Sequence, residues 1–195
     1  GEKLAAALDA FPVDVSEKRC LDVGASTGGF TDVLLDAGAA SVAAVDVGYG
    51  QLLWRLRTDP RVDVFDRTNF RHADPDELGG PFDVVVVDVS FISVGLLAPN
   101  LAAAGHRGTD YVILVKPQFE AGKGRVGKGG VVTDPAVHRS TIEGVADALA
   151  GVGLGARGVI PSPIHGAKGN REFLLHLRPG TSADLSARLA EVTGS

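Results

Sequence analysis

Short apolar runs bounded by glycine, proline and aspartate recur along the chain and predict the strands of a sheet. Residues 83–89 (Asp-Val-Val-Val-Val-Asp-Val) are apolar on both faces, which is typical of a strand that helices cover on both sides. The predicted strands are residues 19–23, 41–47, 62–65, 83–89, 111–115, 156–160 and 173–177.

Segments with apolar residues at helical spacing lie between most of these strands. Leu4, Leu8 and Phe11 share one face of a first helix. Asp134 is a suitable N-cap and Pro135 suits a first helical position, so a helix is expected to begin there. The helices predicted after the first strand are residues 30–37, 51–56 and 135–150.

The order of these elements predicts the fold class. Strand and helix alternate through the first five strands, which indicates a parallel, doubly wound sheet. No helix separates the last two strands, so they should pair as a hairpin. The sequence therefore predicts an α/β fold: a doubly wound, mostly parallel seven-stranded sheet with an antiparallel C-terminal edge hairpin, in one domain over residues 1–195.

Composition narrows the class of protein. The chain has 195 residues, of which 45% are hydrophobic and 22% charged, as in an ordinary globular protein. No apolar run reaches the roughly 18 residues that cross a bilayer, and no signal peptide is visible. A single cysteine, Cys20, excludes an internal disulfide and a thiolate zinc cluster. We expect a cytoplasmic monomer without a membrane segment or a metal.

A glycine-rich loop follows the first strand and opens a helix. Its small residues let a ligand approach the backbone, and free N–H groups at the helix start can bind an anion. The spacing is G-x-x-x-G-G and differs from the G-x-G-x-x-G of nicotinamide enzymes. Asp46 ends the next strand, where a carboxylate can accept hydrogen bonds from ribose hydroxyls. Together they predict a site for S-adenosylmethionine (SAM), with its methionine carboxylate at the helix start.

A side chain after the third strand should read the adenine edge, and Asn69 and Asp66 are both candidates. Asn69 is the one included in the predicted site. The predicted SAM-binding residues are Gly24, Ala25, Ser26, Thr27, Gly28, Gly29, Phe30, Asp46, Val47, Asn69, Asp88 and Ser90.

A second glycine-rich segment, residues 122–129, matches G-x-x-x-x-G-K but lacks the Ser or Thr that would bind magnesium in a nucleotide triphosphatase. We interpret it as a basic loop.

Charged residues occur at strand ends. Asp88 and Lys116 end the fourth and fifth strands, and ligands of open α/β sheets bind beyond the carboxyl ends of strands. Glu172 opens the last strand, and Lys3 begins the first helix. Because a lone buried charge is costly, these residues should be paired. The alternative to a catalytic role is a structural ion pair.

Several long motifs of the chain resemble the TlyA family, the haemolysin A-type ribosomal RNA 2′-O-methyltransferases. The matching segments are residues 22–31, 47–52, 59–62, 67–69, 88–93, 115–124 and 169–173. The resemblance implies SAM-dependent methylation of a ribose 2′-hydroxyl, in cytidine of ribosomal RNA within ribosomal subunits. It also implies a catalytic tetrad of Lys3, Asp88, Lys116 and Glu172.

The chemistry explains this tetrad. A ribose hydroxyl becomes a nucleophile when its proton is removed, and lysine can act as the base if burial or a neighbouring cation favours its neutral form. We assign Lys116 as the base, with Asp88, Lys3 and Glu172 orienting it and the ribose. The sulfonium of SAM is already activated, so positioning is what remains and no metal is needed.

RNA binding has to be reconciled with a net charge of −5, which argues against binding through bulk electrostatics. TlyA proteins usually carry an N-terminal S4-type RNA-binding domain, and we expect this chain to lack it. A local basic patch near Lys116 should contact RNA through Lys123, Arg125 and Lys128.

Two other functions remain open. The chain could bind SAM and act on another substrate, or it could be a membrane-active haemolysin. Against the second, the sequence has neither a spanning segment nor a strongly basic amphipathic helix.

Overall fold

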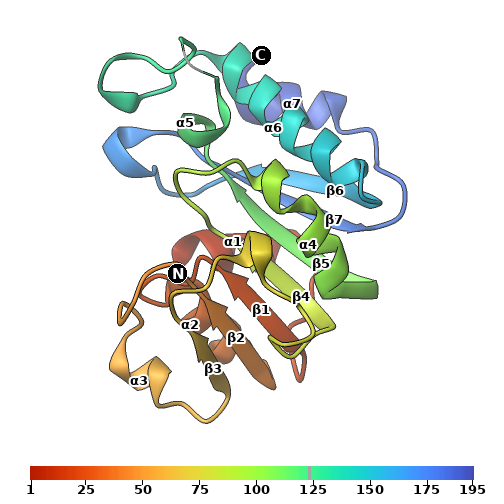
Figure 1. Cartoon of the computed structure of the whole chain (residues 1–195). Coiled ribbons are helices and arrows are strands. Elements are labelled where there is room, and N and C mark those ends of the chain that lie inside the picture. The colour runs from red at the N-terminus through yellow and green to blue at the C-terminus, as the bar shows by residue number, and fades with distance from the viewer. Residues whose placement is uncertain (123) are drawn as a thin grey trace.

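A computed structural model describes residues 1–122 and 124–195 and contains one sheet with helices on both faces (Figure 1). The sheet has seven strands in the order β3-β2-β1-β4-β5-β7-β6. Their bounds are β1 (Arg19–Val23), β2 (Ser41–Val45), β3 (Val62–Phe65), β4 (Phe82–Val87), β5 (Gly105–Val115), β6 (Leu154–Pro161) and β7 (Phe173–Pro179).

The predicted fold class is confirmed. Strands β1 to β5 run parallel, and β7 runs antiparallel to both of its neighbours, β5 and β6. The C-terminal hairpin therefore inserts its second strand into the sheet and leaves β6 at the edge. This insertion places the start of β7 beside the end of β5, where Val115 pairs with Phe173.

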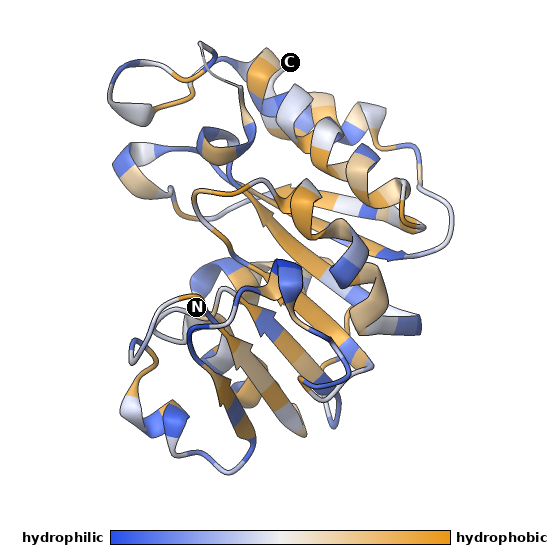
Figure 2. Ribbon diagram, viewed as in Figure 1, coloured by the Kyte–Doolittle hydropathy of each residue, from blue (hydrophilic) through white to orange (hydrophobic). Residues whose placement is uncertain are grey.

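The helices form two layers, and hydrophobic residues concentrate in the sheet between them (Figure 2). They are α1 (Glu2–Ala10), α2 (Gly29–Asp36), α3 (Trp54–Arg57), α4 (Ala98–Ala104), α5 (Pro117–Glu120), α6 (Pro135–Ala150) and α7 (Ser186–Thr193). One buried cluster joins the sheet to α1, α2 and α3, and the other joins it to α4, α6 and α7.

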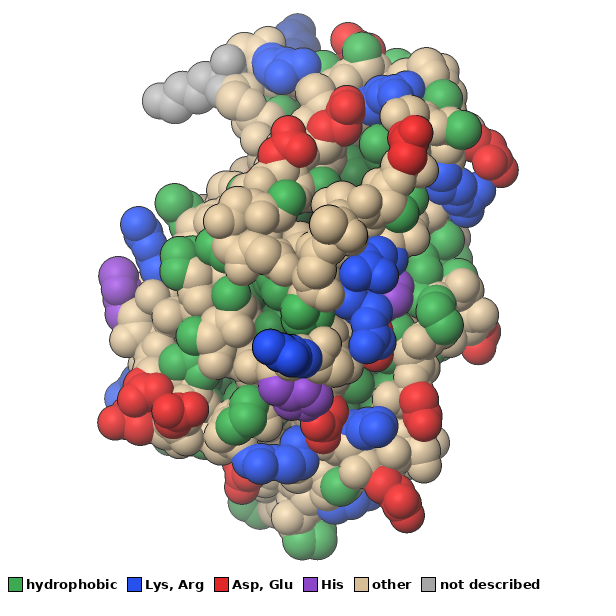
Figure 3. All heavy atoms as spheres, turned by 90° about the vertical axis from the view of Figure 1, so that its right-hand side faces the viewer, with side chains coloured by type: hydrophobic (Ala, Val, Ile, Leu, Met, Phe, Trp, Pro, Cys, Tyr) green, Lys and Arg blue, Asp and Glu red, His purple; other side chains and the backbone are tan. Residues whose placement is uncertain are grey.

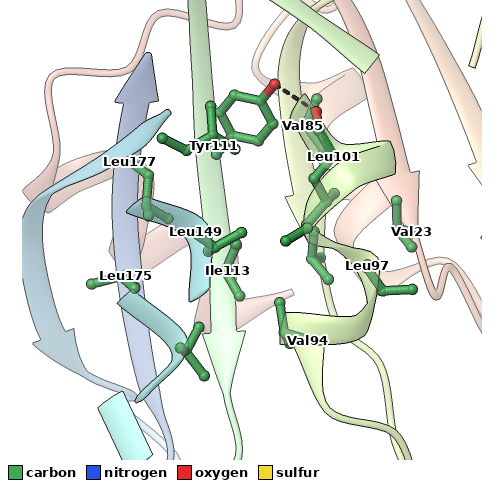
Figure 4. Close-up of a cluster of buried hydrophobic side chains, with 14 of the residues drawn as sticks. Val23, Val85, Val94, Leu97, Leu101, Tyr111, Ile113, Leu149, Leu175 and Leu177 are labelled. Atoms are coloured by element: carbon green, nitrogen blue, oxygen red, sulfur yellow. Dashed lines mark hydrogen bonds between the residues drawn. The ribbon is translucent and has the colours of Figure 1, made fainter. Parts of the chain in front are cut away.

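The second of these clusters is drawn in Figure 4. Leu149 of α6 lies with Ile113 of β5 and Leu177 of β7, all fully buried. The Tyr111 side chain in this view carries a hydroxyl, which donates a hydrogen bond of 2.7 Å to the carbonyl of Leu101. Burial without such a partner would cost a few kcal/mol, so this bond fixes α4 against the sheet.

Three sequence predictions were wrong in detail. The helix expected at residues 51–56 begins at Trp54, because Leu53 is extended (φ −53°, ψ 139°). No α-helix separates β3 from β4, where Pro75 and Pro81 interrupt the chain and only the 3₁₀ turn η1 (Phe70–His72) forms. Helices α4, α5 and α7 were not predicted, since all three are short, and α4 and α7 are rich in alanine or polar residues.

Candidate active site

A cavity of about 440 Å³ opens at the carboxyl ends of β1, β2 and β4. Its volume lies in the range of small-molecule sites. Seven of the predicted SAM-binding residues line it: Gly24, Ser26, Asp46, Val47, Asn69, Asp88 and Ser90. The structure thus brings together residues from four separate segments that the sequence predicted for one ligand.

A smaller cavity of about 210 Å³ adjoins the first, because Gly24, Ser26 and Asp88 line both. The other predicted residues that line it are Ala25, Thr27, Gly29 and Phe30, together with Lys3 of the predicted tetrad. These residues lie at the start of α2, where backbone N–H groups point away from the helix.

Gly28 lines neither cavity, although the sequence placed it in the SAM site. It adopts a left-handed conformation (φ +105°), and any side chain there would overlap Leu52 and Leu56. Its position lets α3 pack against the glycine-rich loop. Gly28 therefore affects the site indirectly, through the packing of α3 against this loop.

Asp46 is held in a fixed orientation by two backbone groups. The N–H of Ser26 donates to Oδ2 (2.7 Å), and the N–H of Gly48 donates to Oδ1 (2.8 Å). A carboxylate offers about four acceptor positions, so capacity for two further donors remains.

The two candidates for the adenine edge are placed differently. Asn69 lines the larger cavity, and its side-chain oxygen caps the η1 turn by accepting from the Arg71 N–H (3.1 Å). Asp66 does not line it and pairs with Arg57 (2.9 Å). The geometry favours Asn69 as the residue that faces a ligand.

The four tetrad residues form two ion pairs that meet at the smaller cavity. Lys3 Nζ lies 2.6 Å from Glu172 Oε1, and Glu172 is 3% exposed. Lys116 Nζ contacts the Asp88 carboxylate and lies 3.0 Å from Ser90 Oγ. Lys3 and Asp88 both line this cavity. Residues 169 positions apart in the chain are therefore joined at one site.

The short helix α5, which follows Lys116, contributes side chains that the sequence analysis left without a role. Gln118 Nε2 donates to Glu172 Oε2 (2.9 Å). Glu120 accepts from Ser93 Oγ (2.7 Å) and from the Val94 N–H (2.9 Å), and burial raises the pKa of Glu120. Both lie in the motif at residues 115–124, which was the available signal. Through these hydrogen bonds, α5 supports the start of β7 at Glu172 and also the segment that contains Ser93 and Val94.

Phe91 was also missed. It lines the larger cavity, is 90% exposed and has a left-handed backbone (φ +64°). Its ring packs on Phe119 with centroids 4.8 Å apart. Hydrophobic patterning assigns a phenylalanine to the core, so only the structure reveals an aromatic ring at the rim of the site.

Beneath the glycine-rich loop, Asp22 is fully buried in β1. Thr31 Oγ1 donates to its Oδ2 (2.7 Å). Burial raises the pKa of Asp22 to about 7. Asp22 lines neither cavity and so acts on the site through α2, which carries Thr31.

The predicted RNA-binding residues are only partly described. Arg125 donates to Ser140 Oγ (3.0 Å), and Lys128 begins the 3₁₀ turn η3 (Lys128–Gly130). Lys123 lies outside the described residues. Among residues 1–122 and 124–195, no group of three His, Cys, Asp or Glu side chains could hold a metal ion. No helix in the same part of the chain is long and apolar enough to cross a membrane.

Comparisons with known proteins agree with this geometry. A family model described as FtsJ-like methyltransferase matches residues 1–179. The 16S/23S rRNA (cytidine-2′-O)-methyltransferase TlyA of Mycobacterium tuberculosis is 53% identical over 186 residues, covering 95% of this chain and 69% of that protein.

Solved structures are similar as well. A candidate haemolysin from Streptococcus thermophilus is 42% identical with a TM-score of 0.94, covering 98% of this chain and 70% of that one. An S-adenosylmethionine-dependent methyltransferase from Mesorhizobium loti shares the fold alone, at 14% identity and a TM-score of 0.64, over 91% of this chain and 98% of that one. Fold, site and family model agree: the chain belongs to the FtsJ-like methyltransferase family, and within it to the TlyA group.

Proposed function

We propose that this protein transfers the methyl group of SAM to a ribose 2′-hydroxyl of ribosomal RNA, in cytidine. The observation that carries the proposal is the meeting of two lysine–carboxylate pairs at a small cavity that adjoins a cofactor-sized one. The names and identity of the relatives support the choice of ribosomal RNA.

The larger cavity has the donors and acceptors that SAM requires. Asp46 keeps acceptor capacity for two ribose hydroxyls, and Asn69 offers its amide to the adenine edge. The first N–H groups of α2, beside Thr27 and Gly29, lie at the adjoining smaller cavity and suit the methionine carboxylate. SAM would therefore extend from the larger cavity into the smaller one. When bound, SAM supplies a methyl group on a sulfonium, which needs no further activation.

The target ribose would lie on the part of the smaller cavity that Lys3, Asp88 and Ile164 line. In its neutral form, Lys116 Nζ would take the proton of the 2′-hydroxyl, whose oxygen would accept the methyl group as the carbon–sulfur bond of SAM breaks and S-adenosylhomocysteine leaves. Asp88 and Ser90 hold Lys116 in place. Lys3, fixed by the buried Glu172, adds a second cation that stabilises developing negative charge on the oxygen. Phe91, at the rim, offers a face on which the target base can stack.

Replacing Lys116 tests the proposal. Lys116→Ala should reduce methyl transfer by at least roughly a hundredfold, because general base catalysis is lost. Its affinity for SAM, measured by calorimetric titration, should stay close to that of the wild type. The measurement is 2′-O-methylcytidine by mass spectrometry, after incubation of SAM with ribosomal subunits.

Lys18→Ala is the matched control, since Lys18 precedes β1 at the opposite edge of the sheet. The assignment of Lys116 is wrong if both variants transfer methyl groups at the wild-type rate. The proposed function itself is wrong if the wild type binds SAM and methylates neither ribosomal subunit nor free ribosomal RNA.

A further inference from the structure

Two loops beside the active site are basic and contain no acidic residue. They are residues 121–133, between α5 and α6, and residues 162–171, between β6 and β7. Over the whole chain acidic residues outnumber basic ones by 24 to 19. On the face shown in Figure 3, which turns the right-hand side of Figure 1 to the viewer, red and blue side chains are interspersed. The two loops therefore depart from the general charge pattern.

Asn170 joins the two loops. It is 2% exposed, and its side chain forms hydrogen bonds with the other loop. Nδ2 donates to the carbonyl of Gly130 (2.9 Å), and Oδ1 accepts from the Val132 N–H (2.9 Å). Nδ2 also donates to the carbonyl of Ala167 within its own loop (3.0 Å). One buried amide thus sets the position of one loop relative to the other.

This joint brings basic side chains of both loops to one place. A methyl group added to Gly130 would lie 3.7 Å from Lys168 Nζ, so Lys168 reaches the η3 turn that Lys128 begins. Lys168 itself has a left-handed backbone (φ +58°). In a residue other than glycine this conformation costs free energy, and it persists where surrounding contacts hold it.

The loop at residues 162–171 also forms a wall of the active site, and Asn170 joins it to the loop at residues 121–133. The N–H of Ser162 donates to the carbonyl of Glu172 (2.8 Å), and any side chain at Gly166 would overlap the Glu172 carboxylate. Ile164 lines the smaller cavity with Lys3 and Asp88. A strand of RNA that places a ribose in that cavity must therefore pass these loops.

We propose that the surface formed by Lys128 and Lys168, joined by Asn170, binds the phosphate backbone of the RNA next to the target nucleotide. The inference rests on the proposed function and adds Lys168 and Asn170 to the RNA-binding residues that the sequence predicts. Lysine side chains on loops without acidic residues attract phosphates, and each contact releases counterions. The surface supplies local positive charge to a protein with a net charge of −5.

The test compares two double variants of equal charge change in the full protein. Lys128→Ala/Lys168→Ala should raise KM for free ribosomal RNA by roughly tenfold or more at 0.1 M salt. The slope of log KM against log salt should fall by about 1.4, the value for two single-strand phosphate contacts. The affinity for SAM and kcat at saturating RNA should not change.

Arg61→Ala/Arg107→Ala is the control, because both arginines lie near the amino ends of strands, at the opposite edge of the sheet. Equal KM values for the two double variants, with a wild type that methylates RNA, overturn the inference and leave the proposed function intact. A loss seen with intact subunits and not with free RNA overturns it in favour of a ribosomal protein. A wild type without methyl transfer overturns the proposed function instead.

Asn170→Ala removes no charge, so it tests whether the side-chain hydrogen bonds of Asn170 between the two loops are needed for RNA binding. Alone it should raise KM for RNA severalfold; added to the lysine double variant it should change KM little, because it acts through the lysines. Independent, additive effects would show that Asn170 supports only the fold. If Asn170→Ala does not fold, the lysine comparison still decides whether the surface binds RNA.

Discussion

At the scale of single residues, the site depends on side chains that position other side chains through hydrogen bonds and ion pairs. Lys3 is fixed by Glu172, and Glu172 is fixed on its other oxygen by Gln118. Gln118 touches neither cavity and is a positioning residue. Such residues escape sequence reasoning because their partners are distant in the chain. The Lys3–Glu172 pair was predicted only through the resemblance to a family, since no spacing rule links positions 3 and 172.

Replacing Gln118 should separate positioning from folding. Gln118→Met keeps the length and loses the donor to Glu172, so kcat should fall by roughly tenfold or more while SAM affinity is kept. Gln118→Glu places a second carboxylate beside Glu172, so methyl transfer should recover as the pH falls and one carboxyl takes up a proton. The measurement is kcat against pH for both variants. A pH profile identical to that of the wild type in Gln118→Glu would contradict this role.

Asp22 gives the protein a characteristic dependence of stability on pH. Its pKa is about 7 in the folded protein and 3.8 as the ordinary value, so the folded state holds a proton that the unfolded state releases. The free energy of unfolding should therefore fall as the pH rises from about 4 to about 7. This fall is of the order of a few kcal/mol. Asp22→Asn, which carries no ionisable proton, should remove it. Urea unfolding at several pH values measures it, and parallel curves for the two proteins would refute it.

At the scale of elements, the backbones at the ends of β1 and β4 are in close contact where the two cavities meet. The N–H of Asp88 donates to the carbonyl of Val23 (2.9 Å), and a side chain at Gly24 would overlap the carbonyl of Asp88. Gly24 also has a left-handed backbone (φ +84°). The position of Asp88, and with it Lys116, therefore depends on the absence of a side chain in the neighbouring strand.

Gly24→Ala should disturb both the fold and the site. The free energy of unfolding should fall by about 1–3 kcal/mol, and SAM binding should be lost as Asp88 is pushed away. Gly144→Ala is the control, because Gly144 lies inside α6 with open space around it and should stabilise the protein by up to about 1 kcal/mol. Thermal unfolding and calorimetric SAM titration check both variants. Retained SAM affinity in Gly24→Ala would refute the argument.

The elements also show where sequence patterns suffice. Helix α6 runs from Pro135 to Ala150 as predicted, because Asp134 caps it by accepting from the Ala136 N–H (2.9 Å). All predicted strands formed, since buried parallel strands need continuous apolar runs. The start of α3 was wrong because its position depends on tertiary contact, Leu52 and Leu56 packing on Gly28. The position of Phe91 also depends on tertiary contact, since its ring packs on Phe119, which follows another strand.

At the scale of the whole molecule, different strands of the sheet position different parts of the site. Gly24 and Asp46 directly follow β1 and β2 and line the larger cavity. Asp88 and Lys116 directly follow β4 and β5, and Glu172 directly precedes β7. The insertion of β7 beside β5 is what brings Glu172 to Lys3. The fold class therefore followed from the order of strands and helices, but which lysine of the proposed tetrad pairs with which carboxylate required three-dimensional contact.

The pairing of Lys3 with Glu172 has a consequence for biosynthesis. A ribosome making this chain adds Glu172 169 residues after Lys3. Because β7 enters the sheet between strands that are already synthesised, the proposed catalytic centre would be completed only after β7 is made. A nascent polypeptide that has formed its glycine-rich loop still lacks the carboxylate that holds Lys3, so we expect it to be inactive towards the ribosome that produces it.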